Sequence, residues 1–306
     1  MTLLSHTLKA KALEIGFSAC GIAKSGEIPD YWQRYVSVLR KGVPSELGFL
    51  ERYREKRLDP GLVMKEARTV ITLLVNYFPQ EILPEEDNFI IAKYAYGKDY
   101  HMVIKEKLNR LIHFIKECCP ESKSRAFVDS GVLMEKAWAQ VCGLGWIGKN
   151  TILINKTAGS FFFIGILLTD LELAPDHPET DHCGNCRKCM DACPTQAIVN
   201  PYELNPSRCI AFHTIEATKG IPEELKDKFG DRIYGCEICQ DVCPYNRFAI
   251  PHHELDFLPD DLLRSMRKKD WYSLSEDQFE DLFKNSPVSR IGYEKLMDTV
   301  RYLSPQ

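Results

Sequence analysis

Eight of the twelve cysteines of this chain lie between residues 183 and 243, in two groups that end in the same way. The first group, CGNCRKCMDACP, starts at Cys183 and has the spacing C-x2-C-x2-C-x3-C-P. The second group consists of Cys209, a spacer of 26 residues and the run CEICQDVCP. Cysteine thiolates at this spacing are typical ligands of 4Fe–4S clusters. Eight such ligands supply two clusters with none left over.

In bacterial ferredoxins with this pattern, the fourth cysteine of each run ligates the other cluster. Structural zinc sites are the alternative, because CxxC pairs also bind zinc. Zinc sites usually combine a CxxC pair with a distant CxxC or with His, and they do not need the x3-C-P ending twice, so the spacing favours iron–sulfur clusters and one-electron transfer. The cross-over rule gives cluster one the ligands Cys183, Cys186, Cys189 and Cys243, and cluster two the ligands Cys209, Cys236, Cys239 and Cys193.

The rest of the composition is that of a soluble protein. The 306 residues carry 39 Lys plus Arg and 43 Asp plus Glu, a formal net charge of −4. The longest apolar run, Phe161–Leu168, is far shorter than the roughly 20 residues of a membrane span, and the N-terminus reads as an amphipathic helix rather than a secretory signal. We therefore expect a cytoplasmic protein without membrane association, whose cysteines serve metal binding or redox chemistry rather than disulfides.

The chain divides into three stretches. Residues 1–175 alternate helical and strand patterns, residues 176–250 hold the cysteines, and residues 251–306 look helical and charged. We predict an α+β fold, a mixed α/β domain followed by a ferredoxin-like domain with two clusters and a helical C-terminal segment. In the first stretch we predict strands at 68–78 and 125–129, helices at 98–119 and 133–143, and a β-hairpin over 151–170 that turns at Lys156–Gly159.

A glycine-rich loop, GLGWIGKN, places Gly143, Gly145 and Gly148 at the spacing G-x-G-x-x-G. A dinucleotide fingerprint needs a strand before this loop and a helix after it, whereas here a helix precedes and a strand follows. The loop is more consistent with close backbone approach to another large cofactor, since exposed amides beside Lys149 and Asn150 would suit phosphate or amide groups. A plain helix C-cap followed by a tight turn stays an open alternative.

Asp129 ends a short apolar strand and is followed by Ser130 and Gly131. A carboxylate at this place is most often a turn former or a helix N-cap. It is also the best-placed general acid of the chain, because burial in a cofactor cavity would raise its pKa and let it hold a proton near pH 7. The basic stretch Arg264–Lys269 is either a solvated helix face or a local phosphate contact.

Several segments in this order resemble the epoxyqueuosine reductase family, which depends on cobalamin and two 4Fe–4S clusters and shares that plan with reductive dehalogenases. The resemblance runs from about residue 5 to about residue 290 and rests on EKRLDP, YGKDYH, VDSG, GLGWIGKN, RCIAFHTIE and the two cysteine groups. It implies reduction of epoxyqueuosine to queuosine at the wobble position of tRNA. Electrons would pass through the clusters to cobalamin, whose nucleophilic cobalt attacks the epoxide while an acid protonates the departing oxygen.

The resemblance also implies roles for individual residues. Asp129 matches the proton donor proposed for the family. The corrinoid would be lined by Arg57, Asp129, Gly148, Lys149, Asn150, Leu153 and Ala211. Many members continue into HEAT-like helical repeats that help to hold tRNA. This chain reads as a short form without them, in which RSMRKK and residues near the cavity would contact the RNA.

Three functions remain to be compared. The first is a tRNA epoxyqueuosine reductase that acts as a monomer, with a reductase, flavodoxin or ferredoxin as electron donor. The second is a cobalamin-dependent reductase of a small molecule, which would work without RNA. The third is a ferredoxin-like electron carrier, which would hold clusters but no cobalt and would leave the first 175 residues without a purpose.

Overall fold

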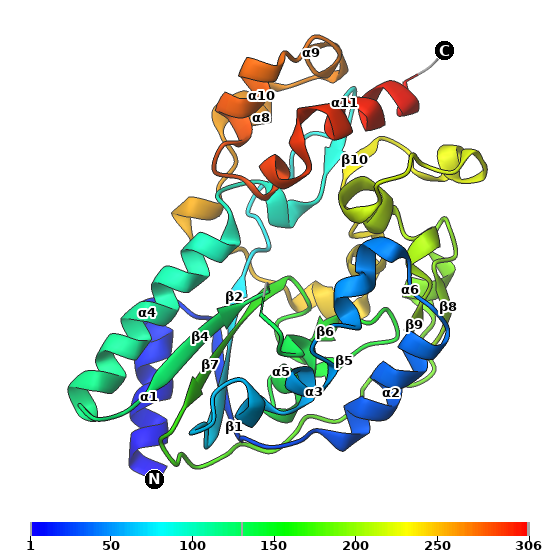
Figure 1. The fold of residues 1–306 in the computed structure, drawn as a ribbon. Coiled ribbons are helices and arrows are strands. Elements are labelled where there is room, and N and C mark those ends of the chain that lie inside the picture. The colour runs from blue at the N-terminus through cyan, green and yellow to red at the C-terminus, as the bar shows by residue number, and fades with distance from the viewer. Residues whose placement is uncertain (1, 130, 305–306) are drawn as a thin grey trace.

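A four-stranded antiparallel sheet forms the centre of the first part of the chain (Figure 1). The computed structural model describes residues 2–129 and 131–304. The strand order is β1-β2-β7-β4, with β1 at Ala19–Lys24, β2 at Thr69–Asn76, β4 at Ser124–Val128 and β7 at Phe162–Thr169. The two central strands are the apolar runs of the sequence, because only they are covered by neighbours on both edges and on both faces. The predicted strands at 68–78 and 125–129 are confirmed.

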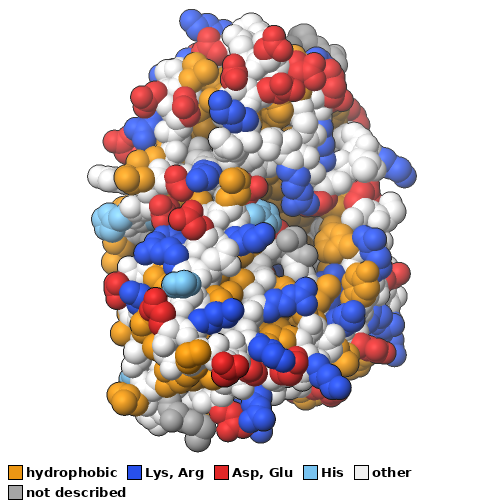
Figure 2. Space-filling view, turned by 60° about the vertical axis from the view of Figure 1, so that its left-hand side comes forward, with side chains coloured by type: hydrophobic (Ala, Val, Ile, Leu, Met, Phe, Trp, Pro, Cys, Tyr) orange, Lys and Arg blue, Asp and Glu red, His pale blue; other side chains and the backbone are white. Residues whose placement is uncertain are grey.

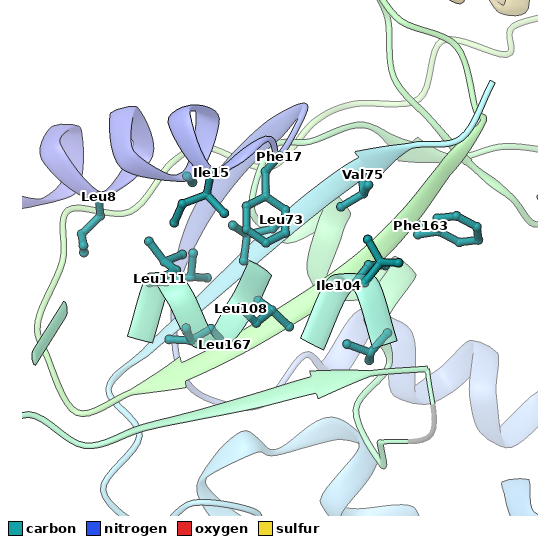
Figure 3. Packing of buried hydrophobic residues seen from close by; sticks show 14 of the residues in the cluster. Leu8, Ile15, Phe17, Leu73, Val75, Ile104, Leu108, Leu111, Phe163 and Leu167 are labelled. Atoms are coloured by element: carbon teal, nitrogen blue, oxygen red, sulfur yellow. The ribbon is translucent and has the colours of Figure 1, made fainter. Parts of the chain in front are cut away.

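Two helices cover one face of this sheet, α1 (Thr2–Ile15) and α4 (Tyr100–Cys118). Figure 3 shows Leu108 and Leu111 of α4 pointing toward the sheet, where they join Leu73 and Leu167 in one core. All four side chains are fully buried. The apolar positions of α4 recur at helical spacing, so the predicted helix over 98–119 is confirmed, and Asp99 caps its N-terminus by accepting a hydrogen bond from His101 N.

The opposite face packs against α5 (Glu135–Val141), which contributes the fully buried Trp138. The predicted helix over 133–143 is therefore confirmed, and Gly143 follows its C-terminus with φ +74°. The predicted hairpin over 151–170 is wrong. Strand β6 (Leu153–Ile154) pairs with β5 (Trp146–Ile147), whereas β7 pairs with β2 and β4. Only Asn155 and Gly159 bridge across the expected turn, because the long apolar run of β7 fills the middle of the large sheet.

The cysteine-rich stretch has little regular structure. Its two short helices, α6 (Lys188–Asp191) and α7 (Ile238–Asp241), each lie inside one cysteine group and pack against each other. Strands β8 (Ile198–Asn200) and β9 (Glu203–Leu204) form a small hairpin, and a π-helix spans Phe212–Glu216. A 3₁₀ helix spans Glu223–Lys228 in the spacer of the second cysteine group.

The C-terminal stretch is helical, as predicted. Its helices are α8 (Asp261–Ser265), α9 (Lys268–Tyr272), α10 (Glu276–Phe283) and α11 (Gly292–Leu303). They share a second core with residues 89–96, which include β3 (Ile90–Ile91), and β3 pairs in parallel with β10 (Arg232–Tyr234). The three predicted stretches thus touch one another through this core, and their boundaries stay a prediction.

The remaining elements lie around the cysteine-rich part and the outer edge of the sheet. They are α2 (Pro29–Arg40), α3 (Arg54–Leu58) and 3₁₀ turns that include Ser45–Leu50 and Pro60–Leu62. Within the described ranges, no helix combines the length and the apolar character that crossing a bilayer requires. Lys and Arg side chains gather across the middle of the face in Figure 2, with apolar side chains exposed between them.

Candidate active site

The first group of thiols gathers around one small cavity. Four cysteines line it: Cys183, Cys186, Cys189 and Cys243. Burial raises the pKa of Cys189 to about 11, and the nearby Cys183 and Cys243 add to the shift because neighbouring thiolates repel. The structure thus brings together the four cysteines that the cross-over rule assigned to cluster one, with the fourth coming from the second sequence group.

The other four thiols form a second set. Burial raises the pKa of Cys236 to about 11, with further contributions from the adjacent Cys209 and Cys193. Burial also raises the pKa of Cys239, again with Cys236 and Cys209 close by. Two N–H groups donate to thiols. The backbone N–H of Ala197 lies 3.3 Å from Cys193 Sγ, and the indole N–H of Trp146 lies 3.4 Å from Cys183 Sγ. Such donors stabilise thiolate ligands of a cluster.

Lys149 and Asn150 support the cysteine loops rather than an open cavity. The Lys149 ammonium donates to Gly184 O at 2.5 Å and to Cys186 O at 2.9 Å. Asn150 donates to Cys239 O at 3.3 Å. Both side chains are buried, and the expected approach of a cofactor to the backbone of this loop stays a prediction. Their hydrogen-bonding capacity is used within the protein, where they connect the loops of both cysteine sets.

The glycines of the same loop are required by its own fold. A Cβ atom on Gly145, where φ is +151°, would lie 2.2 Å from Ile154 O, and one on Gly148 would lie 2.4 Å from Ile154 Cδ1. The loop therefore turns tightly so that β5 can pair with β6. A helix precedes it and a strand follows, as the sequence indicated, which excludes the dinucleotide-binding arrangement.

Asp129 stands at the end of β4 with φ +46°, in the left-handed region. Its Oδ2 accepts a hydrogen bond from Tyr100 Oη at 2.9 Å and lies 3.3 Å from His101 Nε2. His101 Nδ1 in turn lies 2.7 Å from Asp99 Oδ1. Two carboxylates therefore hold one imidazole between them, from the N-terminus of α4 and the C-terminal end of β4. A non-glycine residue in this conformation often marks a functional site.

These contacts decide where the proton sits. We expected burial in a cofactor cavity to raise the pKa of Asp129, and that expectation stays a prediction for the cofactor-bound protein. The Asp129 side chain is half-exposed, and the hydrogen bond from His101, followed by that from Tyr100, lowers its pKa. The bonds to Asp129 and then to Asp99 raise the pKa of His101 to about 9. At neutral pH Asp129 is thus a carboxylate and His101 carries the proton.

A second protonated group contacts the same loop. Glu135 Oε1 accepts a hydrogen bond from the backbone N–H of Asp129 at 2.5 Å, and this contact holds the end of β4 against α5. Burial raises the pKa of Glu135 to about 8, and the neighbouring charge of Asp129 adds to the shift. The next residue, Lys136, donates to Thr151 O at 2.9 Å and so connects α5 to the β5–β6 turn.

The remaining predicted residues are spread around this centre. Arg57 on α3 is half-buried and donates to Phe49 O at 2.8 Å. Ala211 is half-buried and precedes the π-helix that follows Cys209. Leu153 is buried in β6. Sequence reasoning missed Asp99 and Glu135 and left the role of His101 open. The signal for Asp99 was present in the sequence, since an Asp directly before a long helical pattern is an N-cap candidate.

Comparisons with known proteins show the family of this chain. Residues 57–130 match the family model described as "Epoxyqueuosine reductase QueG, DUF1730". The chain is 46% identical to an epoxyqueuosine reductase of Cellulophaga algicola over 299 residues, which cover 98% of this chain and 97% of that protein. This chain belongs to the epoxyqueuosine reductase family. The family enzyme of Escherichia coli is 36% identical, with 95% of this chain and 78% of that protein covered.

The cysteine-rich segment has its own match. Residues 182–246 fit the model of a 4Fe-4S double cluster binding domain. The iron–sulfur interpretation is therefore confirmed against the zinc alternative, while the assignment of single cysteines to each cluster stays a prediction. As a member of the epoxyqueuosine reductase family, the chain is an oxidoreductase.

Solved structures of epoxyqueuosine reductases share the fold. One, with an epoxyqueuosine-modified tRNA-Tyr stem loop, superposes with a TM-score of 0.91 at 31% identity, covering 98% of this chain and 80% of that chain. Another, from Bacillus subtilis, has a catalytic aspartate loop swung out of the active site and superposes with a TM-score of 0.90 at 30% identity, covering 98% of this chain and 81% of that chain. The predicted mixed α/β fold with a two-cluster domain is confirmed.

Proposed function

We propose that this chain reduces epoxyqueuosine in tRNA to queuosine, with electrons that pass through the two clusters to a cobalamin. The observation that supports the proposal most is the group at the end of β4, where Asp129 contacts His101 and Tyr100 within a chain whose family relatives carry this activity in their names. A tRNA substrate implies work in the cytoplasm. A monomeric state and a reductase, flavodoxin or ferredoxin as electron donor stay predictions.

The residues of the chain fit the cofactors unequally. Eight thiols in two sets of four suit two clusters, and we propose the ligand sets given by the cross-over rule. For cobalamin, Arg57, Asp129 and Ala211 keep free surface and could contact the corrinoid directly. In contrast, Gly148, Lys149, Asn150 and Leu153 are buried, so we propose that they support the cofactor wall from behind. Cobalamin supplies, when bound, a strongly nucleophilic reduced cobalt centre.

The net reaction consumes two electrons and two protons, breaks both C–O bonds of the epoxide and releases the oxygen as water. The residues near Asp129 can hold two protons at neutral pH, one on His101 and one on Glu135. We propose that His101 releases its proton through Asp129 to the departing oxygen. Asp129 then acts as the group that passes the proton, and Asp99 keeps the imidazole oriented and charged.

The proposal is tested on protein purified without oxygen and supplied with iron, sulfide and cobalamin. About eight iron atoms and one cobalt per chain are expected from two 4Fe–4S clusters and one corrinoid. With a chemical reductant, the holoprotein should convert epoxyqueuosine to queuosine in an anticodon stem loop, and binding should weaken steeply with salt because phosphate contacts release counterions.

Each alternative has its own result in these assays. Iron without bound cobalt would leave an electron carrier. Turnover of an organohalide with no effect of added RNA would indicate a small-molecule reductase. Affinity for the stem loop that does not change between low and moderate salt would remove tRNA from the proposal.

A further inference from the structure

A cavity of about 390 Å³ opens beside the Asp129 loop, on the outer edge of the sheet. Its walls come from α3 and the turn after it, from β4, and from Gly131 and Val132. The volume lies within the range of small-molecule sites, which starts at roughly 300 Å³. Phe127 and Gly131 line this cavity, and each is two residues away from Asp129 in the sequence. Two residues span at most about 7 Å, so the cavity lies within reach of a chemical group adjacent to one bound at Asp129.

The charge of the cavity is positive although the whole chain is negative. Lys56 and Arg125 line it, and its lining residues include no Asp or Glu. Both cations are exposed, and within the described part of the chain neither forms an ion pair with a carboxylate. Arg125 is positioned by a hydrogen bond from Nη1 to Val63 O at 3.2 Å. Two unneutralised cations in one cavity favour an anionic ligand such as a phosphate.

Aromatic rings lie next to both cations. The Lys56 ammonium is 5.3 Å from the centre of the Tyr53 ring, and the Arg125 guanidinium is 5.0 Å from that of Phe127. Tyr53 is 61% exposed and Leu62 is 51% exposed, so apolar surface faces the opening. A flat apolar surface beside cations is the arrangement that proteins use to stack a base and hold its phosphate. The aromatic surface and the two cations thus complement the base and the phosphate of a nucleotide.

We propose that this cavity binds the nucleotide adjacent to the modified one in the anticodon loop, with Tyr53 as the stacking surface and with Lys56 and Arg125 on its phosphate. The proposal rests on the proposed function, because it assumes a tRNA substrate at Asp129. It names contacts through which this chain holds RNA close to its reacting centre.

The test measures the affinity of the cobalamin- and cluster-loaded protein for a fluorescent anticodon stem loop by anisotropy at several salt concentrations. Tyr53→Ala should weaken binding about tenfold, as for loss of one stacked base. Arg125→Ala should weaken binding and lower the slope of log K against log salt by about one. Arg110→Ala, an exposed arginine of α4, is the matched control and should bind as the wild type does.

A second arm uses stem loops that lack the base on the 5′ or the 3′ side of the wobble position. One of these RNAs should bind wild type about tenfold more weakly, and it should bind Tyr53→Ala and wild type equally well. Wild-type affinity for both abasic RNAs would overturn the proposal, as would unchanged RNA affinity in Arg125→Ala. If instead the variants lose cobalt, the cavity holds the nucleotide tail of cobalamin, and the proposal is wrong. Failure of wild type itself to bind any stem loop would refute the proposed function.

Discussion

Replacing Asp99 by Asn removes one charge at the N-terminus of α4 and keeps the oxygen that His101 contacts. Asp99 Oδ1 accepts the backbone N–H of His101 at 2.9 Å and lies 2.7 Å from its ring Nδ1. Asn caps helices as well as Asp does, so the helix should persist. The change therefore isolates the effect of the Asp99 charge on the imidazole.

The size of the effect follows from the pKa of His101, which is raised from 6.5 to about 9 by Asp129 first and Asp99 second. We expect loss of the smaller contribution, that of Asp99, to lower the pKa of His101 by about one unit. This shift corresponds to about 1.4 kcal/mol of lost stabilisation of the protonated imidazole. A histidine with a raised pKa keeps its proton at pH values below that pKa and loses it at pH values above. At pH 9 the protonated fraction of His101 should fall about fivefold, whereas at pH 6.5 it should hardly change.

The assay is single-turnover reduction of the modified stem loop from pH 6 to pH 10. The alkaline limb of the rate profile should move down by about one pH unit in Asp99→Asn. Asp260→Asn is the matched control, because Asp260 caps α8 in the same way, accepting from Leu262 N at 2.8 Å. An unmoved alkaline limb in Asp99→Asn, or an equal shift in the control, would refute the assignment of the proton to His101.

Three further changes test the rest of the site. Asp129→Asn should keep iron and cobalt but lower turnover by about 100-fold or more, since the amide cannot pass a proton; wild-type turnover would remove Asp129 from the mechanism. Cys193→Ser should alter the electron paramagnetic resonance signal of cluster two and spare cluster one, and the reverse would invert the ligand sets. Lys149→Met should speed the loss of iron in air, because the Gly184 and Cys186 carbonyls lose their donor; iron retention equal to wild type would show that this contact is dispensable.

Much of the fold was readable because its signals are local. The strand over 69–76 and helix α4 were predicted from runs whose spacing repeats within a few residues. Strand β1 was missed, since its small residues give no such signal. They are small because α5 ends against this strand, and a Cβ atom on Gly21 would lie 2.2 Å from Cys142 O. The small residues of β1 are thus required by a contact with a residue about 120 positions further along the chain.

The site shows the same division. The cysteine spacing predicted two clusters, because ligands that wrap one cluster from one loop must follow a fixed pattern. The contact of Asp129 with His101 was not predicted, since His101 comes from a different element. The role of Lys149 was missed for the same reason, because its acceptors in the first cysteine loop are 35 and 37 residues away.

The parallel pairing of β3 with β10 has a consequence for synthesis of the chain. Residues 89–96 supply Phe89, Ile91 and Tyr96 to a core whose other half includes Leu296 and Val300. These apolar side chains leave the ribosome early, and their core stays incomplete until Leu296 and Val300 have emerged. Contacts across some 200 residues slow folding and prolong exposure of apolar surface. We therefore expect the nascent chain to be most prone to aggregation while residues 100–290 are being made.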